Sequence, residues 1–198
     1  MIDKILRSRH IILASGSPRR QEFLKQMGLD FEVRLKPIEE IFPDHLEGPA
    51  ITDYLAELKA SAFEGELNNH EILITSDTIV WHNGKALGKP GTTEEAREML
   101  SSLSGKSHEV ITSVCFKTPK ETRTVNATTR VIFRDLTEEE INFYIQNYKP
   151  FDKAGSYGIQ EWIGLIGIDH IEGSYFNVVG LPTHLVHRTL MEIIGTQT

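Results

Sequence analysis

The chain has 198 residues, of which 39% are hydrophobic and 25% charged, as in an ordinary globular protein. This length predicts one domain over residues 1–198, with a sizeable core and room for two lobes. The net charge of −7 at pH 7 argues against nucleic acid as a partner, because binding it requires a basic surface. Cys115 is the only cysteine, so we expect a buried small hydrophobe and no intrachain disulfide.

Nothing in the sequence predicts export or a membrane anchor. The opening MIDKILRSRH has no apolar segment of the kind that a secretory signal contains. The apolar run 11–14 is much too short to cross a bilayer. We therefore expect a cytoplasmic protein without a membrane partner.

Strands and helices alternate along the first part of the chain. Apolar runs predict strands at 10–14, 31–35 and 71–76, and amphipathic patterns predict helices at 18–28 and 52–67. The polar, proline-containing stretch 36–50 between them is typical of a loop.

From about residue 92 onwards, capping residues mark the starts of two predicted helices. Thr92 with Glu95, and Thr137 with Glu140, have the spacing of a capping box and predict helix starts. Between these helices lie β-rich stretches at 108–117 and 122–133, and short strands are predicted around 156–172 before a helix that begins at Pro182. The long adjacent strands predict an α/β fold with a mixed rather than purely parallel sheet.

The stretch LASGSPRRQEFLKQMG, residues 13–28, ends a strand in a turn and then starts a helix. Ser17 suits the N-cap and Pro18 the first helical position. Arg19 and Arg20 fill the first turn, where the helix dipole is already positive and prefers acids. Together with the Ser15 hydroxyl and the backbone N–H groups of the turn, they suit a phosphate. The alternative is a solvated helix start with two surface arginines.

Asp77 follows the apolar run Ile72–Ile74 in EILITSDTIV. The end of a buried strand is where α/β folds set their site residues, so Asp77 is a candidate for chemistry. An aspartate at a strand end also serves as a turn former, and this reading stays open.

Lys59 falls inside an apolar stripe of its predicted helix. With Leu55 at zero and about 100° per residue, Lys59 lies near 40°, between Ala62 and Phe63. Lysine is seldom buried without a partner, because its ammonium group loses hydration. Lys59 therefore either extends from the edge of the stripe into water or points into a cleft at a bound anion.

Three further charged residues are weaker candidates. Lys89 in ALGKPGT stands in a tight turn that fails as a phosphate loop, because Gly84 is one residue too close and Pro90 replaces the required hydroxyl residue. Glu39 and Glu40 form an acidic pair of the kind that usually faces solvent. Glu40 with Asp77 would suit Mg²⁺, which takes one or two carboxylates plus substrate phosphates.

Seven motifs in order resemble the Maf family of nucleoside triphosphate pyrophosphatases. They are LASGSPRRQEFLKQMG, ELKA, SDTIV, GKP, LSGKSHEVITSV, DKAGSYGIQ and GSYFNVVGLP, and they span about residues 10–190. The resemblance implies cleavage between the α- and β-phosphates with a divalent metal, Mg²⁺ or Mn²⁺, and release of pyrophosphate. It also implies a mixed sheet flanked by helices, with two lobes around a cleft, similar to inosine triphosphatases, and a homodimer.

The resemblance also implies roles for individual residues. It makes Asp77 the proton acceptor, with Glu40 beside the metal and Asp77 as its second ligand. Arg20, Lys59 and Lys89 correspond to phosphate-facing positions, with Lys59 and Lys89 serving catalysis.

The remaining implied positions concern substrate choice. Arg19, Thr78 and Gln160 correspond to family positions tied to substrate choice. Ser15 and Ser17 are substrate-binding candidates because the turn before the helix offers their hydroxyls to an anion. The motif GSYGIQ resembles the branch that acts on dTTP and UTP. Two rival hypotheses remain: a nucleotide-binding regulator of cell division, and a pyrophosphatase for modified purine nucleotides.

Overall fold

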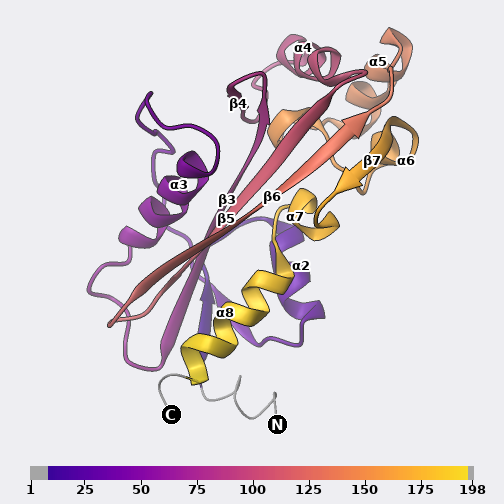
Figure 1. The fold of residues 1–198 in the computed structure, drawn as a ribbon. Coiled ribbons are helices and arrows are strands. Elements are labelled where there is room, and N and C mark those ends of the chain that lie inside the picture. Colours follow the sequence, from indigo (N-terminus) through magenta and orange to yellow (C-terminus); the bar gives the residue numbers. More distant parts are fainter. Residues whose placement is uncertain (1–8, 196–198) are drawn as a thin grey trace. The chain divides into compact units, whose positions relative to one another are not determined.

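The computed structural model describes residues 9–195, and residues 1–8 and 196–198, including most of the opening segment assessed for export, lie outside the described residues. Figure 1 shows the elements, which in chain order are β1 (His10–Leu13), α2 (Pro18–Gln26), β2 (Phe31–Val33), α3 (Pro49–Ser61), β3 (Glu71–His82), β4 (Lys85–Leu87), α4 (Thr93–Leu103), β5 (Ser107–Lys117), β6 (Thr122–Phe133), α5 (Glu138–Tyr148), the 3₁₀ turn η1 (Ala154–Ser156), α6 (Trp162–Gly167), β7 (Ile168–Glu172), α7 (Tyr175–Val179) and α8 (Thr183–Gly195). Within the described part of the chain, no helix has the length and apolar character to cross a membrane.

The strands form one mixed sheet in the order β2-β1-β3-β5-β6-β7, with β4 paired to β3. β1 runs parallel to both β2 and β3, whereas β4 is antiparallel to β3 and β7 is antiparallel to β6. The predicted mixed sheet flanked by helices is therefore confirmed.

The chain divides into two compact units, and β3, β5 and β6 contribute residues to both. Among the described residues, the first unit comprises 9–77, 112–127 and 180–195, and the second comprises 78–111 and 128–179. The predicted cleft between two lobes stays a prediction.

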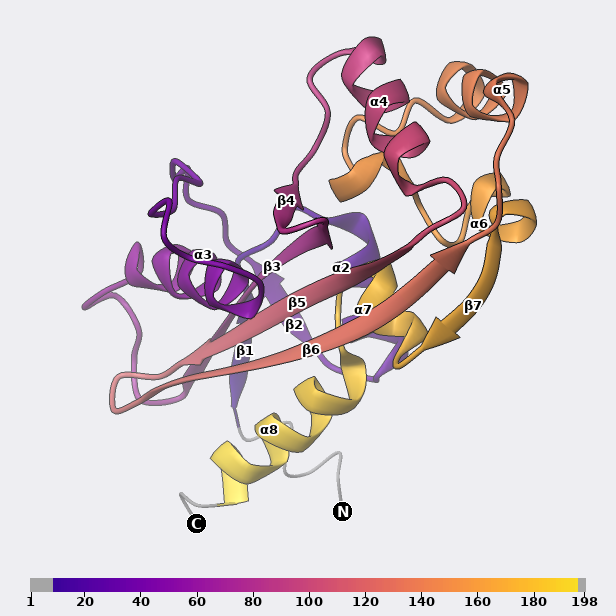
Figure 2. The same ribbon diagram turned by 45° about the horizontal axis from the view of Figure 1, so that its top comes forward.

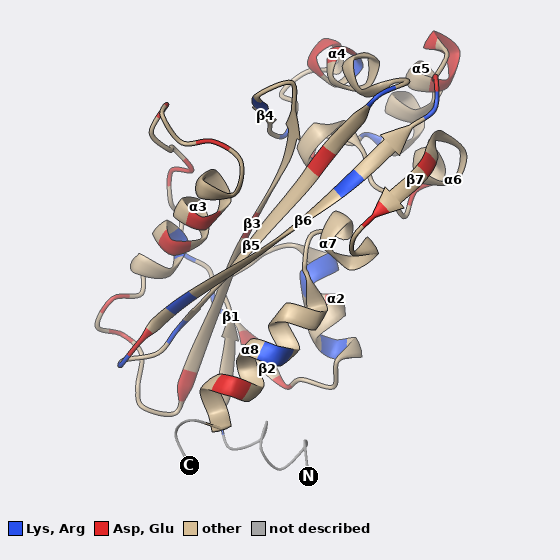
Figure 3. Ribbon diagram, in the orientation of Figure 1, with Lys and Arg blue, Asp and Glu red and all other residues tan. Residues whose placement is uncertain are grey.

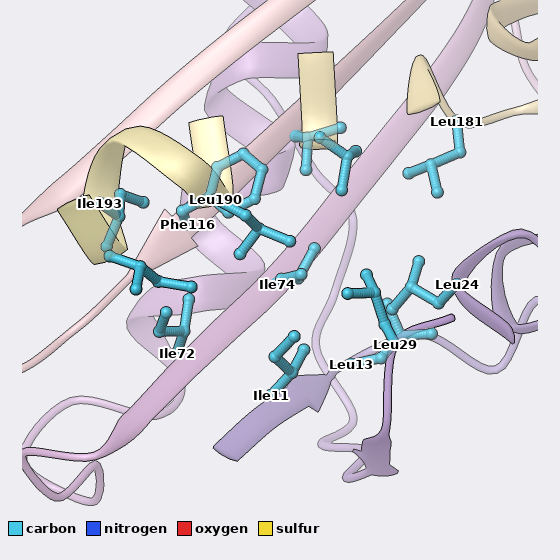
Figure 4. Close-up of a cluster of buried hydrophobic side chains, with 13 residues drawn as sticks. Ile11, Leu13, Leu24, Leu29, Ile72, Ile74, Phe116, Leu181, Leu190 and Ile193 are labelled. Carbon is cyan, nitrogen blue, oxygen red and sulfur yellow. The ribbon is translucent and has the colours of Figure 1, made fainter. Parts of the chain in front are cut away.

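In the first unit, alternate residues of each strand face opposite helical layers. Ile11 and Leu13 of β1 and Ile72 and Ile74 of β3 pack with Leu24 of α2 and with the apolar face of α8 (Figure 4). All of these side chains are buried. Burying apolar surface in this way is the main source of stability for such a layer.

The intervening residues of the same strands face α3. Ile12 and Leu73 pack with Ala56 and Ala60 of that helix, and Cys115 of β5 lies in the same cluster. Cys115 is fully buried, and burial raises the pKa of its thiol, so the predicted small buried hydrophobe is confirmed. The period of two along the strands thus places helices on both faces of this part of the sheet.

The second unit has its own core beneath α4 and α5. These helices lie side by side in both views (Figures 1 and 2) and contribute Leu100, Leu103, Tyr144 and Ile145 to it. The predicted start of α4 is confirmed, because Thr92 accepts a hydrogen bond from the Glu95 N–H at 3.1 Å. The predicted capping box of α5 is complete.

Three details of the sequence prediction are wrong. The predicted helix 52–67 starts earlier, at Pro49, and ends at Ser61. The strand predicted at 71–76 continues to His82. The predicted strands around 156–172 include the helix α6, and only β7 is a strand. The predicted N-cap residue of α2, Ser17, is confirmed, although its side chain makes no capping hydrogen bond.

A buried histidine in the second unit makes the fold sensitive to acid. His108 is 3% exposed, its Nε2 lies 2.7 Å from the Tyr157 hydroxyl, and its ring packs against His82 and Phe133. Burial, with a smaller contribution from His82, lowers the pKa of His108 from 6.5 to about 3. The folded state therefore resists protonation that the unfolded chain accepts.

We expect the free energy of unfolding to fall as the pH drops below about 6.5 towards 3, because the unfolded chain binds a proton that folded His108 does not. Above pH 6.5 both states leave His108 neutral and its contribution is constant. Urea unfolding at pH 7.5 and pH 5 measures the difference in the free energy of unfolding between the two pH values. His108→Gln should make this difference smaller. Exposed His184→Gln is the control and should leave it unchanged; a pH dependence equal in all three proteins contradicts the assignment.

Candidate active site

Lys59 and two carboxylates meet in the first unit. The Lys59 Nζ lies 2.6 Å from Asp77 Oδ1 and 3.1 Å from Glu40 Oε1. The side chains of Lys59 and Asp77 are 15% and 9% exposed, and that of Glu40 is 49% exposed. Lys59 therefore does not extend away into water. It joins two acids that lie 37 residues apart in the sequence.

Asp77 lies beyond the end of the neighbouring parallel strand. β1 pairs with β3 from His10↔Glu71 to Leu13↔Ile74, and the Ala14 N–H donates to the Ile74 carbonyl at 2.9 Å. β3 then continues through Asp77 for five more residues, so the reading of Asp77 as a turn former is wrong. The carboxylate still stands where the parallel strand β1 stops, which is the usual place for a site in an α/β sheet.

Hydrogen bonds to neighbouring strands hold α3, the helix that carries Lys59. Asp53 accepts from Ser113 Oγ at 2.6 Å and from Asn126 Nδ2 at 3.0 Å, and Thr75 Oγ1 donates to the Ala56 carbonyl at 2.6 Å. Figure 3 shows acidic and basic residues on α3, and the only basic residue of this helix is Lys59. The helix is thus fixed on its polar side as well as its apolar side.

The turn before α2 is closed by its own side chains. Ser15 is buried, and its hydroxyl accepts from the Ser17 N–H and from Arg20, both at 3.3 Å. Gln21 Nε2 donates to the Ser15 carbonyl at 3.3 Å. The Ser17 hydroxyl makes no capping hydrogen bond to α2.

Arg20 joins three segments of the first unit. Its Nε donates to the Gly180 carbonyl at 2.9 Å, and its Nη1 donates to the Ser76 carbonyl at 3.0 Å as well as to Ser15. Arg20 is therefore partly a scaffold residue, which the sequence reading as a phosphate-facing arginine did not anticipate. Arg19 beside it is half-buried.

The charges of this group act on one another. Burial lowers the pKa of Arg20 and Arg19 lowers it further, whereas Asp77 and Glu40 oppose the change. Arginine remains protonated at any physiological pH. Two guanidinium groups and one ammonium group therefore stand within electrostatic reach of two carboxylates, an arrangement suited to a metal-bound polyphosphate.

Sequence analysis missed Ser76. Its carbonyl accepts from Arg20 and, at 3.4 Å, from the Lys59 Nζ, and its buried hydroxyl has no hydrogen-bond partner among residues 9–195. A buried polar atom of this kind is uncommon and suits a bound water or ligand. The only signal was the run of polar residues Thr75–Thr78 inside an otherwise apolar strand.

Three predicted site residues belong to the second unit. Thr78 follows Asp77 in β3 and is half-buried, and Lys89 is exposed in the loop between β4 and α4. The carbonyl of Gly88, next to Lys89, accepts from the Gly155 N–H at 3.0 Å. Gln160 is exposed in the turn before α6. The side-chain amide of Gln160 makes no hydrogen bond to any other described residue.

Comparison with known proteins identifies the family. The Maf-like protein family matches residues 10–193. The chain belongs to this family. The resemblance drawn from the seven motifs is thus confirmed, and the match covers both units of this Maf-like protein.

Curated Maf-like relatives align over nearly the full chain. A protein of Flavobacterium psychrophilum named dTTP/UTP pyrophosphatase is 62% identical over 96% of this chain and 98% of its own length. Proteins of the same name from Bacteroides fragilis and Porphyromonas gingivalis are 50% and 45% identical, over 92% and 97% of this chain and 95% and 98% of their own. Among solved structures, the Staphylococcus aureus Ham1 protein matches 64% of this chain and 73% of its own at 20% identity, with a TM-score of 0.44.

Proposed function

We propose that this Maf-like protein hydrolyses dTTP and UTP to the nucleoside monophosphate and pyrophosphate, and so clears surplus or non-canonical nucleotides. The observation that carries the proposal is the contact of Lys59 with both Asp77 and Glu40, beside the arginines of α2. The names of relatives at 45–62% identity support the same substrates.

The first unit supplies the charges that the reaction needs. A nucleoside triphosphate carries about four negative charges, and charge grows on the leaving pyrophosphate as the bond breaks. Arg19, Arg20 and Lys59 neutralise such charge from fixed positions, without reorganisation during the reaction. We assign Lys89 the same task from the second unit, and Ser15 and Ser17 the binding of phosphate oxygens.

Asp77 is the proposed general base. A carboxylate in this position orients a water molecule and takes its proton as the oxygen attacks phosphorus in line. The bond from that phosphorus to the departing pyrophosphate oxygen then breaks. The ammonium group of Lys59 fixes the direction of the Asp77 carboxylate, since the Lys59 Nζ lies 2.6 Å from Asp77 Oδ1.

The donor set fits a divalent cation. Asp77 and Glu40 both contact the Lys59 Nζ, and a divalent cation would bind these carboxylates beside the ammonium group, since Mg²⁺ or Mn²⁺ takes one or two carboxylates plus phosphate oxygens. When bound, such a cation offsets phosphate charge and promotes ionisation of the attacking water. The homodimer and the cytoplasmic location stay predictions.

Gln160 is the proposed reader of the base. Uracil and thymine present an N–H between two carbonyls, and a glutamine amide offers one donor and one acceptor. Cytosine lacks that N–H, so the carbonyl of the glutamine amide is left without a hydrogen-bond donor. Sites that hydrogen-bond a substrate group discriminate strongly against analogues without it.

We expect dTTP and UTP to be cleaved well and CTP poorly, and Gln160→Ala to reduce the ratio of kcat/KM for UTP to that for CTP. Pyrophosphate release with each nucleotide measures the ratio. Gln146→Ala, at an exposed position of α5, is the matched control and should leave the ratio unchanged. Equal kcat/KM for UTP and CTP in the unmutated protein contradicts this assignment.

A further inference from the structure

One buried hydroxyl holds both ends of the turn that carries Gln160. Tyr144 of α5 is fully buried. Its hydroxyl accepts a hydrogen bond from the Gly158 N–H at 3.0 Å and donates one to Glu161 Oε2. Gln160 is the third residue of this turn, and Tyr144 hydrogen-bonds to the first and fourth residues, Gly158 and Glu161.

Glu161 closes the turn a second time. Its N–H donates to the Gly158 carbonyl at 3.0 Å, and its carbonyl accepts from the Gly164 N–H at 2.9 Å, which ties the turn to α6. Its carboxylate also pairs with the Lys153 Nζ at 2.9 Å, and the Lys153 side chain is only 9% exposed. Each charged or polar atom of this network therefore has a partner that constrains the turn.

Two glycines allow a close approach of neighbouring groups to the backbone around Gln160. A Cβ at Gly158 would lie 2.9 Å from both Lys153 Cε and Glu161 Cδ, closer than real Cβ contacts allow. A Cβ at Gly164 would lie 1.9 Å from the Ile159 carbonyl oxygen. The two glycines thus let the ion pair and the helix α6 pack directly against the residues that flank Gln160.

We infer that Tyr144 is a positioning residue for base selection, which sets the place of Gln160 through Gly158 and Glu161. The inference rests on the proposed role of Gln160. Because no part of Tyr144 reaches the surface, it acts through these neighbours and not on the nucleotide. Burial and the bond to Glu161 raise the pKa of Tyr144, so its hydroxyl stays a proton donor at physiological pH.

The test is Tyr144→Phe, which keeps the ring and removes the hydroxyl. We expect the ratio of kcat/KM for UTP to that for CTP to fall about tenfold, the order of effect of losing buried hydrogen bonds. Tyr148→Phe is the matched control, because Tyr148 lies one turn later in α5 and is exposed. Its ring stacks on that of Tyr144, with the two ring centroids 5.1 Å apart. It should leave the ratio unchanged.

The double variant Tyr144→Phe/Gln160→Ala separates positioning from general damage. If Tyr144 acts through Gln160, the double variant has the same ratio as Gln160→Ala alone. A lower melting temperature or lower total activity at an unchanged ratio, or a further independent loss in the double variant, overturns the inference.

A second variant covers the case in which Tyr144→Phe does not fold. Glu161→Gln keeps the shape of the side chain but removes the charge that pairs with Lys153, and it should lower the same ratio about threefold. An unchanged ratio overturns the inference. If Gln160→Ala itself leaves the ratio unchanged, the proposed reader of the base is wrong, and that result is distinct from a failure of Tyr144 alone.

Discussion

Replacing Asp77 with asparagine should lower kcat for dTTP by about 10²–10⁴-fold, the usual contribution of a general base. The shape of the side chain is kept, but the base and one carboxylate of the proposed metal site are lost. The fold should persist, because the asparagine carbonyl still accepts from the Lys59 Nζ and Lys59 keeps Glu40 at 3.1 Å. Steady-state pyrophosphate release and the melting temperature measure the two effects.

Asp30→Asn is the control for the charge change. Asp30 is an exposed aspartate of the same unit, in the turn before β2, and its replacement should leave kcat unchanged. Near-normal kcat in Asp77→Asn contradicts the assignment of the base. A loss of activity that is matched by unfolding assigns Asp77 a structural role instead.

Lys59→Met should lower kcat by about 10²–10³-fold, the effect of removing one fixed group that stabilises developing charge. The methionine keeps the apolar stem within the stripe of α3. We also expect a lower melting temperature in nucleotide-free protein, because the Asp77 carboxylate, 9% exposed, loses its closest cation.

Lys117→Met is a close match for this variant. The Lys117 side chain is 14% exposed, as against 15% for Lys59, and its Nζ lies 2.6 Å from Glu64 in the same unit. Its loss should leave kcat unchanged. Equal kinetic effects of the two substitutions, or full activity of Lys59→Met, would remove Lys59 from the proposed mechanism.

Local patterns predicted most of the fold. Capping residues at Thr92 and Thr137 mark helix starts because their side chains satisfy the first backbone N–H groups, an interaction that needs only neighbouring residues. The continuous apolar runs of β1 and β3 likewise predicted strands, and the buried clusters on the two faces of the sheet confirm them.

Long-range contacts explain what the sequence did not predict. The strand β3 runs through Asp77, a polar residue that would ordinarily end a buried strand, because Lys59 of α3 supplies a partner for its carboxylate and Arg20 bonds the neighbouring Ser76 carbonyl. No local pattern contains that information. Helix α6 was read as strand because its apolar run is short and does not distinguish the two periods.

The candidate site was partly predictable, because some of its residues carry a local signal and others depend on long-range contacts. The lysine inside the apolar stripe signalled an unseen partner, although the stripe alone did not distinguish solvent from a cleft. The position of Arg20 between three backbone segments depends on Gly180, far along the chain, and no spacing rule predicts it. The network of Tyr144 and Glu161 had no signal in the sequence, since Tyr144 fits an ordinary helix pattern and Glu161 lies in the stretch that was predicted as strand.

Identifying the first products of dTTP hydrolysis tests the central claim most directly. The purified protein is incubated with dTTP and Mg²⁺ or Mn²⁺, and early time points are separated by anion-exchange chromatography, with Asp77→Asn as the blank. The proposed mechanism predicts dTMP and pyrophosphate in equal amounts from the first time point. The appearance of dTDP and orthophosphate, or binding of dTTP without any turnover, would contradict it.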